Sequence, residues 1–96
     1  MTEYTIDLKG VRGPADLHHR IAEALQAPDY YGYNLDALYD LLTEMAGPAE
    51  IRFTGLVDAR QIMPGTIGTL QQLCKDVSEE NEGIQMRMEE NHDQGR

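Results

Sequence analysis

Three short segments of this 96-residue chain alternate apolar with polar residues, and this alternation constrains the fold more than any other feature. Each segment predicts a β-strand with one apolar face, and together they span residues 4–8, 49–54 and 84–88. A strand covered by helices on both faces would instead be apolar along its whole length. The alternation therefore predicts a sheet whose helices all lie on one side.

Helical periodicity fills the intervals between these strands. Apolar residues at steps of three and four predict helices over residues 14–26, 35–45, 56–63 and 66–80. Strands that are separated by helices favour parallel pairing with right-handed crossovers. The expected fold class is therefore α/β, a two-layer fold with a three-stranded parallel β-sheet and four helices on one side.

Several turn residues and one helix face make this outline more specific. Pro14 suits the first position of its helix, and Gly47 followed by Pro48 predicts a stop after the second helix. Pro64 and Gly65 are expected to end the third helix. The residues that should face inward on that third helix are Leu56, Ala59, Ile62 and Met63.

The length of the chain suits one domain with a modest core. We expect this domain to span residues 1–90 and the polar residues 91–96 to form a flexible tail. No apolar run approaches the ~20 residues that cross a bilayer, and no leader segment is visible before the first strand. The single cysteine, Cys74, excludes an intrachain disulfide and is compatible with a reducing compartment. The expected location is the cytoplasm, away from membranes.

The charge of the chain is strongly negative, at −9, and it is unevenly distributed. No Lys or Arg lies between Arg20 and Arg52, whereas six acidic residues fall in that interval. Nucleic-acid binding normally needs a cluster of Lys and Arg, so the sequence argues against a nucleic-acid partner. A negative field instead attracts basic proteins, although an acidic surface that only keeps the protein soluble explains the charge alone equally well.

Residues 29–42 combine this acidity with four of the five tyrosines in the chain. Gly32 is expected to take a positive backbone φ in a turn, and Asn34 to cap the following helix. The polar face of that helix carries Asp36, Asp40, Thr43 and Glu44, with Tyr39 at its edge and Tyr30, Tyr31 and Tyr33 in the turn before it. At least one of Tyr30 and Tyr31 should be a core residue. Tyrosines around an acidic face predict a surface that binds a basic protein.

Other chemistries have weaker support. Asp36 and Asp40 share a helix face and could divide acid and base roles, but such a pair needs a cleft that shifts its pKa values. His18 and His19 are adjacent and point about 100° apart, so they lack the spacing of metal ligands. Cys74 lies on an apolar stripe, where a free cysteine is usually a small buried hydrophobe. We therefore expect no metal and no cofactor.

The string PDYYGYNLDALYD, residues 28–40, resembles the signature of the barstar family, the intracellular inhibitors of barnase-type ribonucleases. Asp16, Leu17 and His18 also fit, as does the order of strands and helices, so the resemblance covers about residues 4–88. It implies an inhibitor rather than an enzyme, namely an immunity protein that protects its producer from a toxic nuclease. Such an inhibitor blocks the active site of a guanyl-specific ribonuclease with its second helix and the loop before that helix.

The resemblance also implies roles for single residues. Asp40 matches the carboxylate that mimics an RNA phosphate, Asp36 matches a second acidic contact, and Asp76 is the nearest equivalent of an acidic contact on the last helix. Tyr30 matches an aromatic contact. With the tyrosines and the polar helix face added, the expected partner-binding residues are Tyr30, Gly32, Tyr33, Asn34, Leu35, Asp36, Tyr39, Asp40, Thr43 and Asp76.

Two departures from the family pattern fall around this surface. Tyr39 stands where the family has a Trp, and a Glu after the second helix is replaced by Gly47 or lost through a shorter loop. These departures affect the identity of the partner more than the fold. The expected partner is a basic protein, a barnase-like ribonuclease, bound by a chain that is monomeric when free. The alternative is a binding module of the same fold that serves another basic protein or a toxin of a different class.

Overall fold

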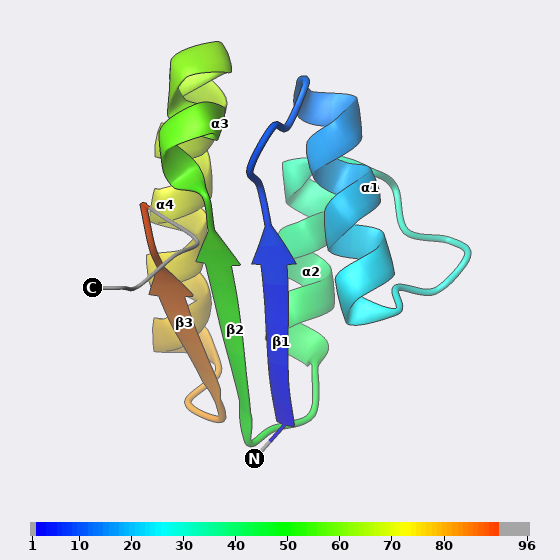
Figure 1. Cartoon of the computed structure of the whole chain (residues 1–96). Coiled ribbons are helices and arrows are strands. Elements are labelled where there is room, and N and C mark those ends of the chain that lie inside the picture. Colours follow the sequence, from blue (N-terminus) through cyan, green and yellow to red (C-terminus); the bar gives the residue numbers. More distant parts are fainter. Residues whose placement is uncertain (1, 91–96) are drawn as a thin grey trace.

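The computed structural model describes residues 2–90, and the predicted flexible tail lies outside these described residues. Strands and helices follow one another along the chain as in Figure 1. The elements are β1 (Thr2–Asp7), α1 (Pro14–Leu25), α2 (Leu35–Glu44), β2 (Ala49–Thr54), α3 (Leu56–Ile62), α4 (Pro64–Glu80) and β3 (Ile84–Met88).

The three strands form one sheet in the order β1-β2-β3, and both pairs are parallel. Phe53 at the centre of the sheet pairs with Ile6 of β1 and with Met88 of β3. Alternation places Ile6, Ile51 and Phe53 on the helix-covered side, where all three are buried. The predicted α/β fold, with three parallel strands in one sheet and four helices, is confirmed.

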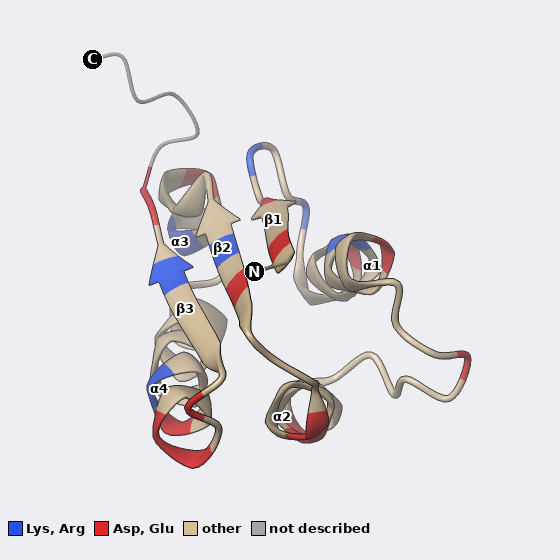
Figure 2. Ribbon diagram, turned by 90° about the horizontal axis from the view of Figure 1, so that it is seen from below, with Lys and Arg blue, Asp and Glu red and all other residues tan. Residues whose placement is uncertain are grey.

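The helices α1, α2 and α4 form the second layer against the sheet (Figure 2). The short helix α3 continues from the end of β2, beyond the tips of the strands, and packs against α4 (Figure 1). The helices α2 and α4 pack side by side. This pairing puts the acidic helix predicted from the sequence next to the last helix of the chain.

The sequence misplaced the junction between α3 and α4. Pro64 and Gly65 open α4 rather than ending α3, because a proline needs no N–H partner at the first helical position and its φ already suits a helix. Ile62 was expected to face inward, but it is 52% exposed. At 100° per residue it lies about 100° from the centre of the stripe formed by Leu56, Ala59 and Met63, and so it faces the solvent.

Two arginines on the uncovered face of the sheet are held in ion pairs. Glu50 lies 3.8 Å from the guanidinium of Arg52 and 3.5 Å from that of Arg87. Glu89 lies 3.4 Å from Arg52 and 4.0 Å from Arg87. These arginines therefore meet carboxylates on the face opposite to the helices, and they do not neutralise the acidic helix. Over residues 2–90 no helix has the length and apolar character to span a membrane.

Candidate functional site

We call residues 27–34, which precede α2, the tyrosine loop. Its two adjacent tyrosines, Tyr30 and Tyr31, lie in different environments. Tyr31 is 6% exposed and belongs to the hydrophobic core, and its N–H donates to the carbonyl oxygen of Pro28 at 2.9 Å. Tyr30 is 87% exposed and projects away from the protein. The expectation that at least one of the two is a core residue is confirmed. The pair gives this tyrosine loop one anchor and one accessible aromatic ring.

The left-handed residue of the tyrosine loop is Tyr33, with φ of 56°, and not Gly32 as expected. Gly32 instead leaves space for a close approach. A Cβ on Gly32 would lie 3.1 Å from Nδ2 of Asn34 and 3.3 Å from Cβ of Ala37, because the loop folds back closely over the start of α2. The glycine permits a close approach, while packing of the Tyr33 ring holds the strained backbone.

Asn34 caps α2 as predicted. Its Oδ1 accepts from the N–H of Ala37 at 2.8 Å, and its Nδ2 donates to the carbonyl oxygen of Gly32 at 3.0 Å. One side chain therefore ties the loop to the first turn of the helix. Asn34, one of the expected binding residues, lies at the end of the loop, where both the oxygen and the nitrogen of its amide make hydrogen bonds.

The helix α2 is a firmly held platform for its acidic face. Leu38 and Leu42 are fully buried beneath it, and Asp36 and Asp40 are exposed on the opposite side. The hydroxyl of Thr43 donates to the carbonyl oxygens of Tyr39 and Asp40, at 2.9 and 3.2 Å. The packed leucines fix the helix, so the carboxylates are displayed on a rigid element rather than on a mobile loop.

A groove of about 210 Å³ runs between α2 and α4. Its lining residues are Leu35, Asp36, Tyr39, Thr69, Gln72, Leu73 and Asp76. Asp76 accepts a hydrogen bond from Nε2 of Gln72 at 3.1 Å, which steadies its carboxylate. The fold thus brings Asp76, forty residues from Asp36 in the sequence, onto the same surface as the acidic helix.

The environment of Tyr39 is strongly acidic. The pKa of its phenol is raised, first by partial desolvation and then by the carboxylates of Glu80, Asp76 and Asp40. Figure 2 shows acidic positions on both α2 and the end of α4. Glu80 was absent from the predicted set, although its spacing of four residues from Asp76 was a usable signal. We call Asp36, Tyr39, Asp40, Asp76 and Glu80 the acidic surface.

Asp40 lines a second hollow, of about 170 Å³, on the other side of α2. The remaining residues that form it are Pro28, Tyr30, Tyr31, Ala37, Leu41 and Glu44. Asp36 lines the α2–α4 groove instead, so among the described cavities none holds both carboxylates. General acid and base catalysis by this pair would need a shared site around one substrate, and the geometry does not provide it.

Asn81 joins the far end of α2 to the turn between α4 and β3. Its Nδ2 lies within hydrogen-bonding distance of three carbonyl oxygens at the end of α2, those of Leu42, Thr43 and Met45, at 3.4, 3.2 and 2.9 Å. Its Oδ1 accepts from the N–H of Gly83 at 3.1 Å. Carbonyls at the end of a helix lack the partners that the helix interior supplies, although that of Leu42 also accepts from the N–H of Met45 at 3.3 Å. Asn81 therefore fixes how α2 lies relative to α4.

Gly47 lies against the same turn. A Cβ on Gly47 would come within 2.5 Å of the carbonyl oxygen of Gly83, so no side chain fits here without movement of the backbone. A larger side chain at this point is incompatible with this approach of the two chain segments.

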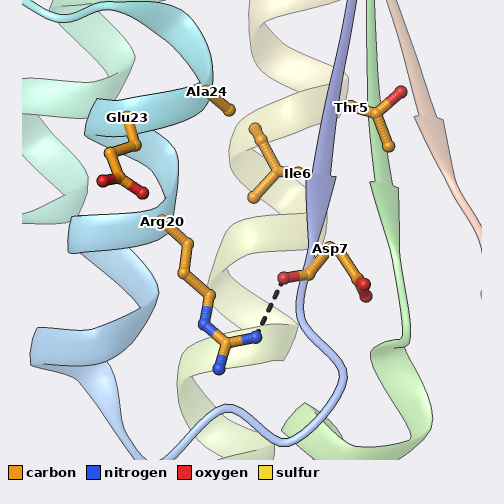
Figure 3. Close-up of a pocket in the computed structure, with 6 residues that line it drawn as sticks. All are labelled: Thr5, Ile6, Asp7, Arg20, Glu23 and Ala24. Atoms are coloured by element: carbon orange, nitrogen blue, oxygen red, sulfur yellow. Dashed lines mark hydrogen bonds between the residues drawn. The ribbon is translucent and has the colours of Figure 1, made fainter.

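A larger cavity, of about 570 Å³, lies between β1 and α1 and is separate from the acidic surface (Figure 3). The guanidinium of Arg20 spans its side, where it donates to the carbonyl oxygens of Asp7 at 3.0 Å and Lys9 at 2.7 Å. This arginine holds the chain after β1 against α1. Its hydrogen bonds serve the fold, and none of the predicted site residues reaches this cavity.

One further predicted feature, Cys74, is structural. Cys74 is buried, and burial raises the pKa of its thiol to about 12, so it packs as a small hydrophobe as expected. No group of three or more His, Cys, Asp or Glu within residues 2–90 is arranged to hold a metal ion. Within the described residues, the acidic surface and the tyrosine loop together present exposed carboxylates beside exposed aromatic rings.

A comparison with protein families supports the resemblance seen in the sequence. The family described as Barstar (barnase inhibitor) matches residues 1–90, which is most of the chain and includes every element of the fold and the whole acidic surface. The match extends beyond the signature string to all three strands and four helices. The chain belongs to the barstar family.

Proposed function

We propose that this protein inhibits a barnase-like ribonuclease by covering its active site with the tyrosine loop and α2. The observation that carries the proposal is the acidic surface, where Asp36, Asp40, Asp76 and Glu80 from two helices surround Tyr39. A ribonuclease binds RNA phosphates with Arg, Lys and His. A partner that presents carboxylates from rigid helices is complementary to such a site in charge and in geometry.

Asp40 is the residue that mimics an RNA phosphate. It is exposed at the middle of α2, it borders the hollow under Tyr30, and its carboxylate contributes to the field around Tyr39. The buried Leu38 and Leu42 hold the helix beneath it. Because the free protein already fixes the helix that carries this carboxylate, binding needs little reordering of the backbone, which favours affinity.

The remaining surface has room for supporting contacts. The exposed ring of Tyr30 offers a large apolar area at low entropic cost. Asp36 and Asp76 flank the α2–α4 groove and suit basic side chains at the edge of the ribonuclease site. Gly32, Asn34 and Leu35 form the backbone that lies against the enzyme. Tyr39, in place of the family's Trp, alters the ring at the centre of this surface.

The test is a titration of the protein into barnase while RNA cleavage is followed. We expect stoichiometric inhibition by the natural protein and a loss of several kcal/mol of binding free energy in Asp40→Ala, because the cationic site of the enzyme loses its counter-charge. Glu23→Ala is the matched control, since Glu23 is an exposed carboxylate on α1, beside the β1–α1 cavity. Equal inhibition by Asp40→Ala would refute the phosphate mimicry.

The rate of association gives a second test. A basic enzyme is steered by the −9 charge of the chain, and salt screens such steering over about 8 to 10 Å. The association rate constant should therefore fall as salt is added. Absence of inhibition by a folded protein would direct the search to another basic partner or a toxin of a different class.

A further inference from the structure

Two adjacent histidines of α1 contact the tyrosine loop. His18 is 4% exposed, and its Nδ1 shares a hydrogen bond of 2.8 Å with the hydroxyl of Tyr31. The bond joins residues thirteen positions apart and is itself buried. This bond satisfies the hydroxyl of Tyr31, whose ring is buried in the core, whereas the preceding residue, Tyr30, is exposed.

His19 makes the second contact. Its ring meets the ring of Tyr33 edge to face, with centroids 5.3 Å apart, and Tyr33 in turn lies 5.2 Å from the ring of Tyr31. The rings of His18 and Tyr31 are 6.0 Å apart. The four rings therefore connect α1 to the loop at two points. Tyr33 has a left-handed backbone, a conformation that persists only when its surroundings hold it.

The hydrogen bond between His18 and Tyr31 is well suited to holding the loop. Burial, with a smaller contribution from Tyr33, raises the pKa of Tyr31 to about 12, so its hydroxyl stays neutral. A buried hydroxyl that loses its hydrogen-bond partner keeps the cost of desolvation, so the bond favours one position of the loop. Contacts of rings alone would allow the loop to slide.

We propose that His18 and His19 are positioning residues for partner binding, which hold Tyr31 and Tyr33 so that the loop presents Tyr30 and Gly32 in one fixed geometry. The role follows from the inhibitor function proposed above, but neither histidine lies on the acidic surface. Their effect on binding is therefore indirect and acts through the order of the loop.

The first measurement uses the free protein and needs no partner. His18→Leu should raise the exchange rate of the loop amides, with the Tyr31 N–H as the main reporter, about tenfold, while amides of β2 and α4 change little. His18→Asn should restore protection, because the asparagine amide places a polar atom close to the position of Nδ1. Ile84→Ala, on the sheet edge far from α1, is the control that lowers stability without touching the loop.

The second measurement is binding to barnase. His18→Leu and His19→Ala should raise the dissociation rate constant about tenfold and leave the association rate constant unchanged, since the charge that steers the enzyme is unaltered. His18→Asn should return the dissociation rate toward that of the natural protein. His19 is exposed, so its variant tests the role without risk to the core.

Two results would overturn the proposal. One is that the loop amides of His18→Leu exchange as slowly as those of the natural protein. The other is that the amides of β2 and α4 in His18→Leu exchange faster by the same factor as in Ile84→Ala. If the natural protein does not bind barnase, the proposed partner is wrong, but the exchange measurement still decides whether the histidines position the loop.

Discussion

Asn81→Ala gives a direct measure of how the acidic surface is assembled, because the Asn81 side chain, at the C-cap of α4, bonds to the end of α2. The amide of Asn81 carries two hydrogens, so it can satisfy two of the three nearby carbonyl oxygens at a time, and its Oδ1 holds the N–H of Gly83. Three hydrogen bonds are therefore lost. At about 0.5–1.5 kcal/mol each, with water reaching part of this half-buried site, we expect a loss of about 2 kcal/mol.

The assay is urea unfolding followed by circular dichroism. With an m value of about 1 kcal/mol/M for a domain of this size, the midpoint should fall by about 2 M. Asn81→Asp is the matched comparison. It keeps the acceptor for Gly83 but puts a negative charge beside the carbonyl end of α2, where the helix dipole is also negative, so at pH 7 it should be less stable than Asn81→Ala.

Two outcomes would refute this reasoning. The first is a change below about 0.5 kcal/mol in Asn81→Ala, which would mean that water replaces the amide at no cost. The second is greater stability of Asn81→Asp than of Asn81→Ala. If the reasoning holds, Asn81→Ala should also weaken partner binding, because α2 and α4 would no longer be held in register across the groove.

Three further predictions concern the core, the turn and pH. Leu42→Ala should cost about 3 kcal/mol in urea unfolding, because Leu42 is fully buried under the acidic helix; a cost below about 1 kcal/mol would contradict its role in the platform. Gly47→Ala should lower the melting temperature, since its Cβ would meet the carbonyl oxygen of Gly83, and an unchanged melting temperature would show that the turn moves freely. Burial lowers the pKa of His18 below its ordinary value of 6.5, so the unfolded chain binds the proton first and stability falls as pH drops below 6.5. The urea midpoint measured at pH 7.5 and 5.5 should show this loss, and His18→Asn should show less of it; an equal loss in both would assign the pH dependence to other groups.

The sequence was a reliable guide to the elements of the fold. Strand alternation predicted which residues of β1, β2 and β3 face the helices, and the periodic stripe of α4 was buried as expected. Asn34 was correctly identified as the cap of α2. These features depend on neighbours within a few residues, so the local pattern of side chains contains the information that decides them.

The errors fall where a residue has two compatible roles. Pro64 can end one helix or begin another, and in the structure it takes the first position of α4, after the end of α3. Gly32 could supply either a positive φ or space for a close approach, and the loop uses the space while Tyr33 takes the positive φ. In both cases the local sequence permits each alternative, so contacts from elsewhere in the chain choose between them.

By itself, then, the sequence determined the three parallel strands, the four helices, the cap of α2 and the acidic face of that helix. The tertiary structure decided which distant residues join that face. It brought Asp76 and Glu80 beside Tyr39, separated Asp36 from Asp40 into different hollows, joined His18 to Tyr31 and placed Asn81 at the end of α2. The physical reason is that periodicity fixes the direction of a side chain within its own helix, whereas its neighbours on another helix depend on how the two helices pack and on the register between them.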